Sequence, residues 1–259
     1  MRSLITGASR GIGRAIARRL ACDGARLALC ASSPSAELEA SAADCRAGGA
    51  EVQTLSADLA LPDAPQRLID AAVERFGGLD GVVSNAGIVK SGPLDTLDLE
   101  SWDTVFNVNV RGVWQLARAA HPHLEKSRGA MVAVASMSGV EPYAGTGAYS
   151  PSKAALIMLV RVLAQEWAAG GVRVNAVSPG LFLSALTQPI YADEQRKAAR
   201  EALVPMHRIG APAQDLAGLG EFLLSADATY LTGQNIVIDG GLLGSIQSHL
   251  AGRPQTGTR

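Results

Sequence analysis

Cysteine is scarce in this chain. Its three cysteines are too few and too irregularly spaced for a disulfide scaffold, and they favour structural thiols in a reducing compartment. Cys22 and Cys45 fall in predicted helices and Cys30 in a predicted strand, so none is expected to act as a nucleophile. The four histidines show no metal-ligand spacing, and we predict no metal site.

Long apolar runs and a strong charge of either sign are also absent. No segment approaches the roughly 18 uninterrupted apolar residues of a membrane-spanning helix. A net charge of −1 provides no basic surface, so neither nucleic acid nor a membrane is an expected partner. The first predicted strand begins almost at Met1, which leaves no room for a signal peptide. These absences predict a soluble, cytoplasmic protein, and its 259 residues suffice for one large core.

Short apolar runs alternate with longer helical patterns, as is typical of repeated βαβ units. Strands are predicted at Arg2–Thr6, Arg26–Ala31, Glu51–Ser56, Leu79–Val83, Ala130–Ser136, Val172–Ser178 and Asn235–Ile238. Helices are predicted at Gly11–Cys22, Pro34–Ala47, Ala64–Phe76, Leu99–Lys126, Tyr149–Ala168 and Ala213–Ser225. We therefore expect an α/β protein with a doubly wound Rossmann fold. Its seven-stranded parallel sheet would be flanked by helices on both faces, in a single domain over residues 1–241.

The stretch from Ser184 to Pro212 interrupts this alternation. It carries its own helical pattern at Asp193–Leu203, and long insertions in compact domains are usually lids or binding loops. We predict a substrate lid over residues 184–212. The tail at residues 242–259 is polar and is expected to end disordered or to dock on a neighbouring subunit.

A glycine-rich loop follows the first predicted strand and opens the first helix. Its three glycines suit a tight turn, a close approach of the backbone to a pyrophosphate, and tight helix–strand packing. The helix N-terminus adds free N–H groups and a positive dipole end. The loop predicts dinucleotide binding rather than a purely structural turn, through Gly7, Ser9, Arg10, Gly11, Ile12 and Gly13.

The end of the second strand bears on which dinucleotide is bound. An NAD site places an acidic residue there, whereas this chain has Ser32 and Ser33 and no acid before Glu37. These serines leave room for a 2′-phosphate and can donate hydrogen bonds to it. Arg10 can form an ion pair with the same phosphate, unless Arg10 is only a solvated turn residue. NADP(H) is therefore favoured over NAD(H). Asp58, after the third strand, suits an adenine contact and a helix N-cap equally well.

Three polar side chains are predicted to meet at a carbonyl or alcohol group. Ser136 ends an apolar strand, and ligands on open α/β sheets gather at the carboxyl ends of strands. Tyr149 and Lys153 are four residues apart, so a helix places them on one face. An ammonium beside a phenol moves the phenol's pKa from about 10 toward neutrality. Alone, Tyr-x-x-x-Lys is most simply a chance pair, but the glycine loop removes that interpretation.

With these motifs in place, the chain resembles the short-chain dehydrogenase/reductase family, in its compact single-domain branch. The resemblance covers about Ser3 to Gly241. It rests on Thr6–Gly13, Asp58, Asn85-Ala86-Gly87, Asn109, Ser136, Tyr149, Lys153, Pro179-Gly180 and Asp239-Gly240-Gly241. It implies that Tyr149 is the general acid/base, that Ser136 polarises the substrate oxygen, and that Lys153 holds the nicotinamide ribose and lowers the tyrosine pKa. It also implies that Asn109 kinks a long helix and binds a proton-relaying water.

The resemblance implies further cofactor contacts as well. These are expected from Asp58, Leu59, Asn85, Ala86, Gly87, Pro179, Gly180, Phe182 and Ser184. The chain departs from the family pattern at two positions. Ser84 stands where the family usually has Asn, and Ser184 stands where it usually has Thr, so a hydroxyl is kept there. Family members also form homo-oligomers, commonly a dimer of dimers, through the helices at Leu99–Lys126 and Tyr149–Ala168. The alternative is that both helices pack wholly inside the monomer.

We predict hydride transfer between a nicotinamide and a ketone or secondary alcohol, with the substrate class open. The expected pocket is apolar to mildly polar, from Val89, Val140, Pro142, Tyr143, Leu181, Phe182, Leu186, Ile190 and Tyr191. Glu141 is either a polyol-binding group or a surface charge. Ala130 and Gly170 stand where carrier-protein reductases present basic residues, which argues mildly against a 3-oxoacyl-carrier substrate and leaves sugars and polyols open. The alternatives are a cofactor-binding sensor or scaffold without turnover and a nucleotide-sugar dehydratase or epimerase.

Overall fold

The computed structural model describes residues 1–142, 144–184 and 187–245 of the 259-residue chain. Its centre is a seven-stranded sheet in the order β3-β2-β1-β4-β5-β6-β7, with every neighbouring pair parallel. The expected doubly wound Rossmann architecture is confirmed. The strands are β1 (Arg2–Thr6), β2 (Arg26–Ala31), β3 (Glu51–Ser56), β4 (Gly81–Ser84), β5 (Ala130–Val134), β6 (Arg173–Pro179) and β7 (Asn235–Ile238).

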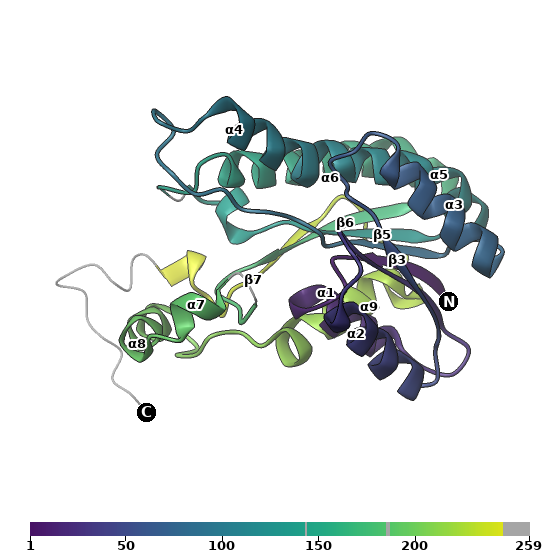
Figure 1. The fold of residues 1–259 in the computed structure, drawn as a ribbon, viewed down its shortest axis with the longest axis horizontal. Coiled ribbons are helices and arrows are strands. Elements are labelled where there is room, and N and C mark those ends of the chain that lie inside the picture. Colours follow the sequence, from purple (N-terminus) through teal and green to yellow (C-terminus); the bar gives the residue numbers. More distant parts are fainter. Residues whose placement is uncertain (143, 185–186, 246–259) are drawn as a thin grey trace.

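Helices cover both faces of this sheet (Figure 1). One face is covered by α3 (Ala64–Phe76), α4 (Leu99–Phe106), α5 (Val113–Ser127) and α6 (Tyr149–Trp167). The other face is covered by α1 (Gly11–Leu20), α2 (Ala36–Ala47) and α9 (Ala217–Leu224). Between α4 and α5 lies a π-helical segment, η1 (Asn107–Gly112), and a second one, η4 (Pro212–Leu216), leads into α9. Short 3₁₀ turns complete the described chain at η2 (Met137–Gly139), η3 (Ala168–Gly170) and η5 (Ala226–Ala228).

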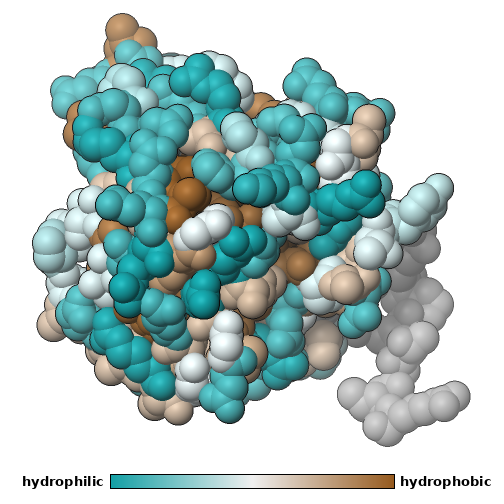
Figure 2. Space-filling model, turned by 90° about the vertical axis from the view of Figure 1, so that its right-hand side faces the viewer, coloured by the Kyte–Doolittle hydropathy of each residue, from teal (hydrophilic) through white to brown (hydrophobic). Residues whose placement is uncertain are grey.

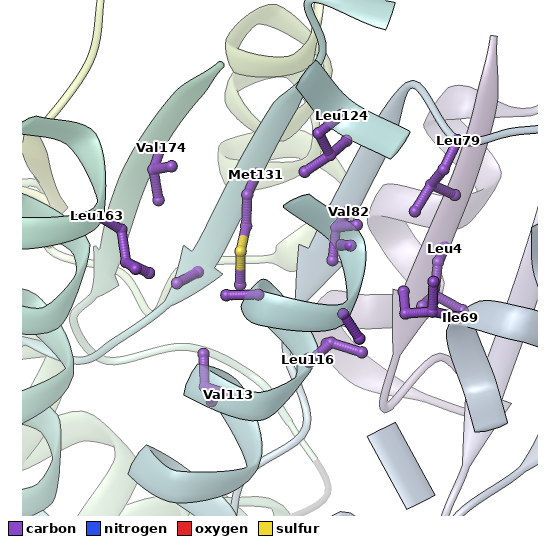
Figure 3. Packing of buried hydrophobic residues seen from close by; sticks show 14 of the residues in the cluster. Leu4, Ile69, Leu79, Val82, Val113, Leu116, Leu124, Met131, Leu163 and Val174 are labelled. Atoms are coloured by element: carbon purple, nitrogen blue, oxygen red, sulfur yellow. The ribbon is translucent and has the colours of Figure 1, made fainter. Parts of the chain in front are cut away.

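Two apolar cores result, one on each side of the sheet. Figure 3 shows the first, in which Leu4, Val82 and Met131 of neighbouring strands meet Leu116 of α5 and Leu163 of α6. The second lies under α1, α2 and α9. The central strands are apolar on both faces because helices cover both, as parallel sheets require. Hydrophilic side chains cover most of the face seen in Figure 2 and surround a smaller apolar area.

Several helix ends differ from the sequence predictions for local reasons. The first helix ends at Leu20, so Cys22 lies outside it in an exposed position, whereas Cys30 and Cys45 are buried as free thiols. Helix α2 begins at Ala36 because the Ser35 side chain accepts a hydrogen bond from the Leu38 N–H. None of the helices in the described ranges is long and apolar enough to cross a bilayer.

The insertion after β6 contains the expected helix, α8 (Glu194–Leu203), preceded by a short α7 (Gln188–Tyr191). The Asp193 carboxylate caps α8 by accepting from the N–H groups of Gln195 and Arg196. The two ends of the insertion are joined by backbone hydrogen bonds, from Leu183 to Gly210 and from Gly210 to Leu181, each 2.9 Å long. This closed base holds α7 and α8 near β7, beside the carboxyl edge of the sheet (Figure 1).

Candidate active site

The carboxyl ends of β1, β4 and β5 lie next to one another and carry the polar residues of the site. Ser136 was predicted to be the last residue of a strand. In the structure β5 ends two residues earlier, at Val134, and Ser136 lies just beyond the strand with an extended backbone. Ala135 donates a last hydrogen bond to the Val177 carbonyl of β6, and the chain then turns into η2 with Ser136 as its N-cap. The hydroxyl therefore stands beyond the edge of the sheet, where ligands bind in open α/β folds.

Tyr149 is the first residue of α6, and Lys153 lies one turn further along the same helix. The Lys153 ammonium lies 5.7 Å from the centre of the Tyr149 ring and donates a 2.8 Å hydrogen bond to the Val134 carbonyl at the end of β5. The Ser136 hydroxyl lies close enough to the Tyr149 phenol to affect its pKa. The structure thus brings together the three side chains that the sequence predicted to converge.

Burial governs the protonation of both α6 groups. Desolvation raises the pKa of the Tyr149 phenol above its ordinary value, and the hydrogen bond from Ser136 opposes that rise. Desolvation lowers the pKa of the Lys153 ammonium to about 8. The expected net lowering of the tyrosine pKa is therefore wrong: burial raises this pKa, and the contribution that opposes the rise comes from Ser136 rather than from Lys153.

Asn109 lies in η1 and is completely buried. Its side-chain amide donates to the Ile88 carbonyl and to the Ser152 hydroxyl, each at 3.0 Å, and its side-chain oxygen accepts from the Ile88 N–H at 2.9 Å. Both amide protons are thereby used, so the side chain joins the loop after β4 to α6. The π-helical turn is the distortion that the family resemblance implied for this helix.

The glycine loop has the shape of a phosphate cradle. Gly7 and Gly11 have φ values of +63° and +58°, a region that suits glycine, and a Cβ at Gly13 would overlap the Gly7 carbonyl. Helix α1 has no side-chain cap at Arg10 and no acidic residue in its first turn. Its first N–H groups therefore have no side-chain cap, which fits a dinucleotide pyrophosphate. Ser9 and Ile12 belong to the same turn.

Thr6 and Asn85 fasten this cradle to the catalytic side. The Thr6 hydroxyl accepts from the N–H groups of Asn85 and Ala86, and the Asn85 amide donates to the carbonyls of Thr6 and Gly7, with all four distances between 3.0 and 3.1 Å. Gly87 follows, and a Cβ there would lie 3.3 Å from the Lys153 nitrogen. The loop after β4 thus contacts both the cradle and Lys153.

The end of β2 is open and lacks an acidic side chain. Ser32 and Ser33 are exposed there, as is Arg10. Hydrogen bonds at the start of α2 lower the pKa of Glu37, and the charge of Arg10 makes a smaller contribution in the same direction. Arg10 and Glu37 are thus close enough for their charges to interact.

Asp58 and Leu59 lie after β3 and have different environments. Asp58 is exposed and accepts from the Ala60 N–H at 2.9 Å, while α3 begins only at Ala64, so its N-cap interpretation is wrong. The Leu59 side chain is buried in the core, which leaves only its backbone for a cofactor.

The segment after β6 approaches the cradle from the other side. Gly180 donates to the Ile238 carbonyl at 2.8 Å, directly after Pro179, the last residue of β6. Ser184 lies closest to the glycine loop, with its Cβ 3.8 Å from where a Cβ would stand at Gly11. Its hydroxyl lies 3.1 Å from that of Thr187. Thr187 was not singled out from the sequence, although it places a threonine hydroxyl next to Ser184, the position at which the family usually has threonine.

A cavity of about 520 Å³ opens at the turn that follows Ser136, and Ser136, Tyr149 and Lys153 are not among its lining residues. It is lined by the predicted Val140 and Pro142, and also by Glu141, Leu94 and Ser138, which the prediction treated as uncertain or omitted. Ser138 was detectable as a second hydroxyl two residues after Ser136.

Other predicted pocket residues lie elsewhere. Phe182 and Tyr191 are 5% and 6% exposed, and Phe182 packs on Gly210. Leu181 and Phe182 both line a separate cavity beside β7. Val89 is exposed and Ile190 partly exposed. Tyr143, Leu186 and the tail beyond Ser245 lie outside the described residues.

Ala130 and Gly170 do not flank the site. Ala130 is the buried first residue of β5, paired with Gly81 and Arg173, and Gly170 follows the far end of α6 beside Glu125. Both therefore lie at the amino edge of the sheet. Their expected position at the mouth of the active site is wrong, so they say nothing about a carrier-protein substrate.

Comparisons with known proteins agree with this geometry. A family model described as enoyl-(acyl carrier protein) reductase matches residues 7–243. The chain is 36% identical over 242 residues to 3beta-hydroxysteroid dehydrogenase 1 of Eggerthella lenta, covering 92% of each chain. It is 34% identical over 241 residues to the 3-oxoacyl-[acyl-carrier-protein] reductase FabG of Staphylococcus epidermidis, covering 93% of this chain and 98% of that one. The Pseudomonas aeruginosa RhlG/NADP active-site complex superposes with a TM-score of 0.85 at 34% identity, over 93% of this chain and 95% of that one. The chain belongs to the short-chain dehydrogenase/reductase family of oxidoreductases.

Proposed function

We propose that the protein transfers hydride between NADP(H) and a ketone or secondary alcohol, with Tyr149 as the general acid/base. One observation carries this proposal. The Ser136 hydroxyl, the Tyr149 phenol and the Lys153 ammonium converge at the end of β5, and only β4 separates this strand from β1 and its phosphate cradle. The bound nicotinamide supplies or accepts the hydride.

In the reducing direction, Tyr149 gives its proton to the oxygen as negative charge develops there. Ser136 hydrogen-bonds the same oxygen, which places a second donor where the transition state needs one. Lys153 lies 5.7 Å from the centre of the ring, where it would hold the nicotinamide ribose. With a pKa of about 8, Lys153 is mostly charged at neutral pH and can itself release a proton under mildly alkaline conditions.

NADP(H) is favoured because the end of β2 offers hydroxyls and no acid. Ser32 and Ser33 are exposed, and Arg10 stands at the neighbouring loop with its charge facing the same region. A carboxylate at the end of β2 would repel the 2′-phosphate and select NAD(H). The NADP complex of the similar P. aeruginosa protein supports this preference. The negative charge of Glu37, which interacts with that of Arg10, works against it.

The substrate would occupy the cavity beside Ser136, whose 520 Å³ lies within the usual range of small-molecule pockets. Its lining combines apolar side chains with the Glu141 carboxylate and the hydroxyls of Ser138, Thr146 and Ser150. Such a surface suits a carbonyl compound that is apolar in part and carries further polar groups. The names of the similar proteins, a steroid dehydrogenase and an acyl-carrier-protein reductase, place two substrate classes first for testing.

The test is an absorbance assay at 340 nm. NADPH and NADH are each supplied with steroids, β-ketoacyl thioesters, keto-sugars and simple ketones, using the wild type and Tyr149→Phe. We expect oxidation of NADPH by at least one class and a loss of roughly 10²–10³ in rate for the variant. Preference for NADH would refute the cofactor assignment. Tight cofactor binding without turnover of any substrate would instead support a sensor.

We also propose that the protein forms a homo-oligomer through α5 and α6. Trp114 of α5 and Met158 and Val162 of α6 are 41%, 55% and 45% exposed, which is unusual for apolar side chains on two neighbouring helices. Light scattering after gel filtration should give at least a dimer. The double charge substitution Met158→Lys with Val162→Glu is expected to yield monomers, and an unchanged mass would contradict this interface.

A further inference from the structure

Ser138 lies two residues beyond Ser136, in the 3₁₀ turn η2, and is only 8% exposed. Its hydroxyl oxygen is 2.7 Å from that of Ser136, and its backbone N–H donates to the same Ser136 oxygen at 3.2 Å. Ser138 also lines the cavity where the substrate would bind. A second buried hydroxyl therefore contacts the catalytic serine directly.

The direction of the proton between these two hydroxyls matters for catalysis. A serine hydroxyl has one proton to donate and two lone pairs that accept. If Ser136 gave its proton to Ser138, it would have none for Tyr149 or for a substrate oxygen. If Ser138 donates instead, Ser136 accepts from the Ser138 N–H and O–H, and its own proton points onward. The Ser138 N–H already donates to the Ser136 oxygen, which fits the arrangement in which Ser136 accepts from Ser138 and keeps its own proton for Tyr149.

We propose that Ser138 is a positioning residue, whose hydroxyl donates to Ser136 and directs the Ser136 proton toward Tyr149 and the substrate oxygen. This inference rests on the proposed oxidoreductase function. Hydroxyls linked in a chain polarise one another, so a donor behind Ser136 also makes Ser136 a stronger donor.

The backbone around Ser138 is held firmly enough to fix this geometry. Gly139 donates to the Ser136 carbonyl at 3.0 Å, and Val140 and Glu141 both donate to the Met137 carbonyl. A Cβ at Gly139 would lie 2.7 Å from the Lys153 carbonyl carbon, so the turn packs directly against α6. The two hydroxyls are thus placed by the same turn that meets the catalytic helix.

The test is a double-mutant cycle read by single-turnover hydride transfer. Ser138→Ala should lower the rate roughly threefold to tenfold, the effect of one neutral hydrogen bond, with the KM for substrate changed less than twofold. In a Ser136→Ala background the same substitution should change nothing, because the proton it directs is gone. Losses that multiply in the double variant, or a loss confined to KM, would overturn the proposal.

Matched variants separate this role from general packing. Ser41→Ala removes a buried hydroxyl of α2 that has no hydrogen-bond partner among the described residues and lies on the other face of the sheet, and it should leave the rate unchanged. Ser138→Cys keeps a side chain of similar size but offers only a weak hydrogen-bond donor, and it should lower the rate as much as Ser138→Ala does. This variant keeps the test valid if alanine disturbs the fold. Ser138→Thr keeps the hydroxyl and should restore the rate to within twofold. Failure of threonine together with wild-type behaviour of cysteine would assign Ser138 a packing role only.

A readout without turnover keeps this inference separate from the proposed function. Tyrosine ionisation is followed by absorbance at 295 nm, and the difference between each protein and its Tyr149→Phe counterpart reports Tyr149 alone. The pKa of Tyr149 should be higher in Ser138→Ala than in the wild type, because Ser136 then donates more weakly. Equal pKa values would overturn the role of Ser138 even if no substrate is found, whereas absent turnover alone counts only against the enzyme assignment.

Discussion

Replacing Lys153 with methionine is expected to remove a pH-dependent contribution to stability that comes from its buried ammonium. The side chain is 4% exposed, and burial lowers its pKa from 10.5 to about 8. Between these two values the unfolded chain binds a proton that the folded chain does not. The free energy of unfolding therefore rises with pH across this window, and below pH 8 the contribution disappears because both states are protonated.

The size of this effect follows from the pKa shift. One pKa unit corresponds to about 1.4 kcal/mol, and the titrations are gradual at both ends, so Lys153 adds roughly 2 kcal/mol between pH 8 and pH 10. Burial raises the pKa of the Cys30 and Cys45 thiols to about 12 and about 11, so these groups lower stability above pH 9. Because the thiols are present in wild type and variant alike, the difference between the two isolates Lys153.

The assay is urea unfolding followed by circular dichroism at pH 8, 9 and 10. Wild type, Lys153→Met and the exposed control Lys126→Met are compared at each pH. The free energy of unfolding of the wild type should gain roughly 2 kcal/mol relative to Lys153→Met across this range, with no such gain relative to the control. A constant difference between wild type and Lys153→Met would show that burial does not perturb the lysine, and the electrostatic account of the site would fail with it.

Three further changes test other parts of the structure. Gly13→Ala should lower the melting temperature and the cofactor affinity, because its Cβ would overlap the Gly7 carbonyl. The control Gly218→Ala has open space around it in α9 and should be neutral or stabilising. A Gly13→Ala variant that is stable and binds the cofactor would contradict the cradle geometry. Arg10→Ala should raise the KM for NADPH roughly tenfold and leave that for NADH nearly unchanged, and equal effects on both would remove Arg10 from cofactor selection. Arg173→Met should lower the free energy of unfolding by roughly 2 kcal/mol in urea titrations. The buried guanidinium donates to the carbonyls of Leu223 and Ser225, at the end of α9, at 2.7 and 2.9 Å. An unchanged unfolding midpoint would show that these hydrogen bonds are dispensable.

Much of the fold was predictable from hydrophobic periodicity. Strands β1, β2, β3 and β7 and helix α3 begin and end at the predicted residues. Apolar runs bounded by turn residues define such elements locally. The ends that differ depend on contacts across the molecule, as when the Ala135 N–H pairs with Val177 and the chain then leaves the strand before Ser136.

The site was predictable as a set of residues but not as an electrostatic environment. Ser136, Tyr149 and Lys153 meet as their spacing and the strand–helix order indicated. The raised pKa of Tyr149 depends on how much of the ring the fold buries, which no spacing reveals. The contact between Ser138 and Ser136 depends on a 3₁₀ turn that brings residues two apart into hydrogen-bonding distance. The misplacement of Ala130 was avoidable, because a residue that begins a parallel strand lies far from that strand's carboxyl end.

The order of strands in the sheet has a practical consequence for coenzyme engineering. The residues proposed to choose between the two nicotinamide coenzymes stand at the end of β2, while the proposed proton transfer takes place at the end of β5, with β1 and β4 between them. Three strand spacings amount to roughly 14 Å, well beyond direct side-chain contact. On the proposed function, an acidic residue introduced at Ser32 is therefore expected to favour the unphosphorylated coenzyme while the proton donor keeps its surroundings. Selectivity and turnover are separate design variables in this molecule.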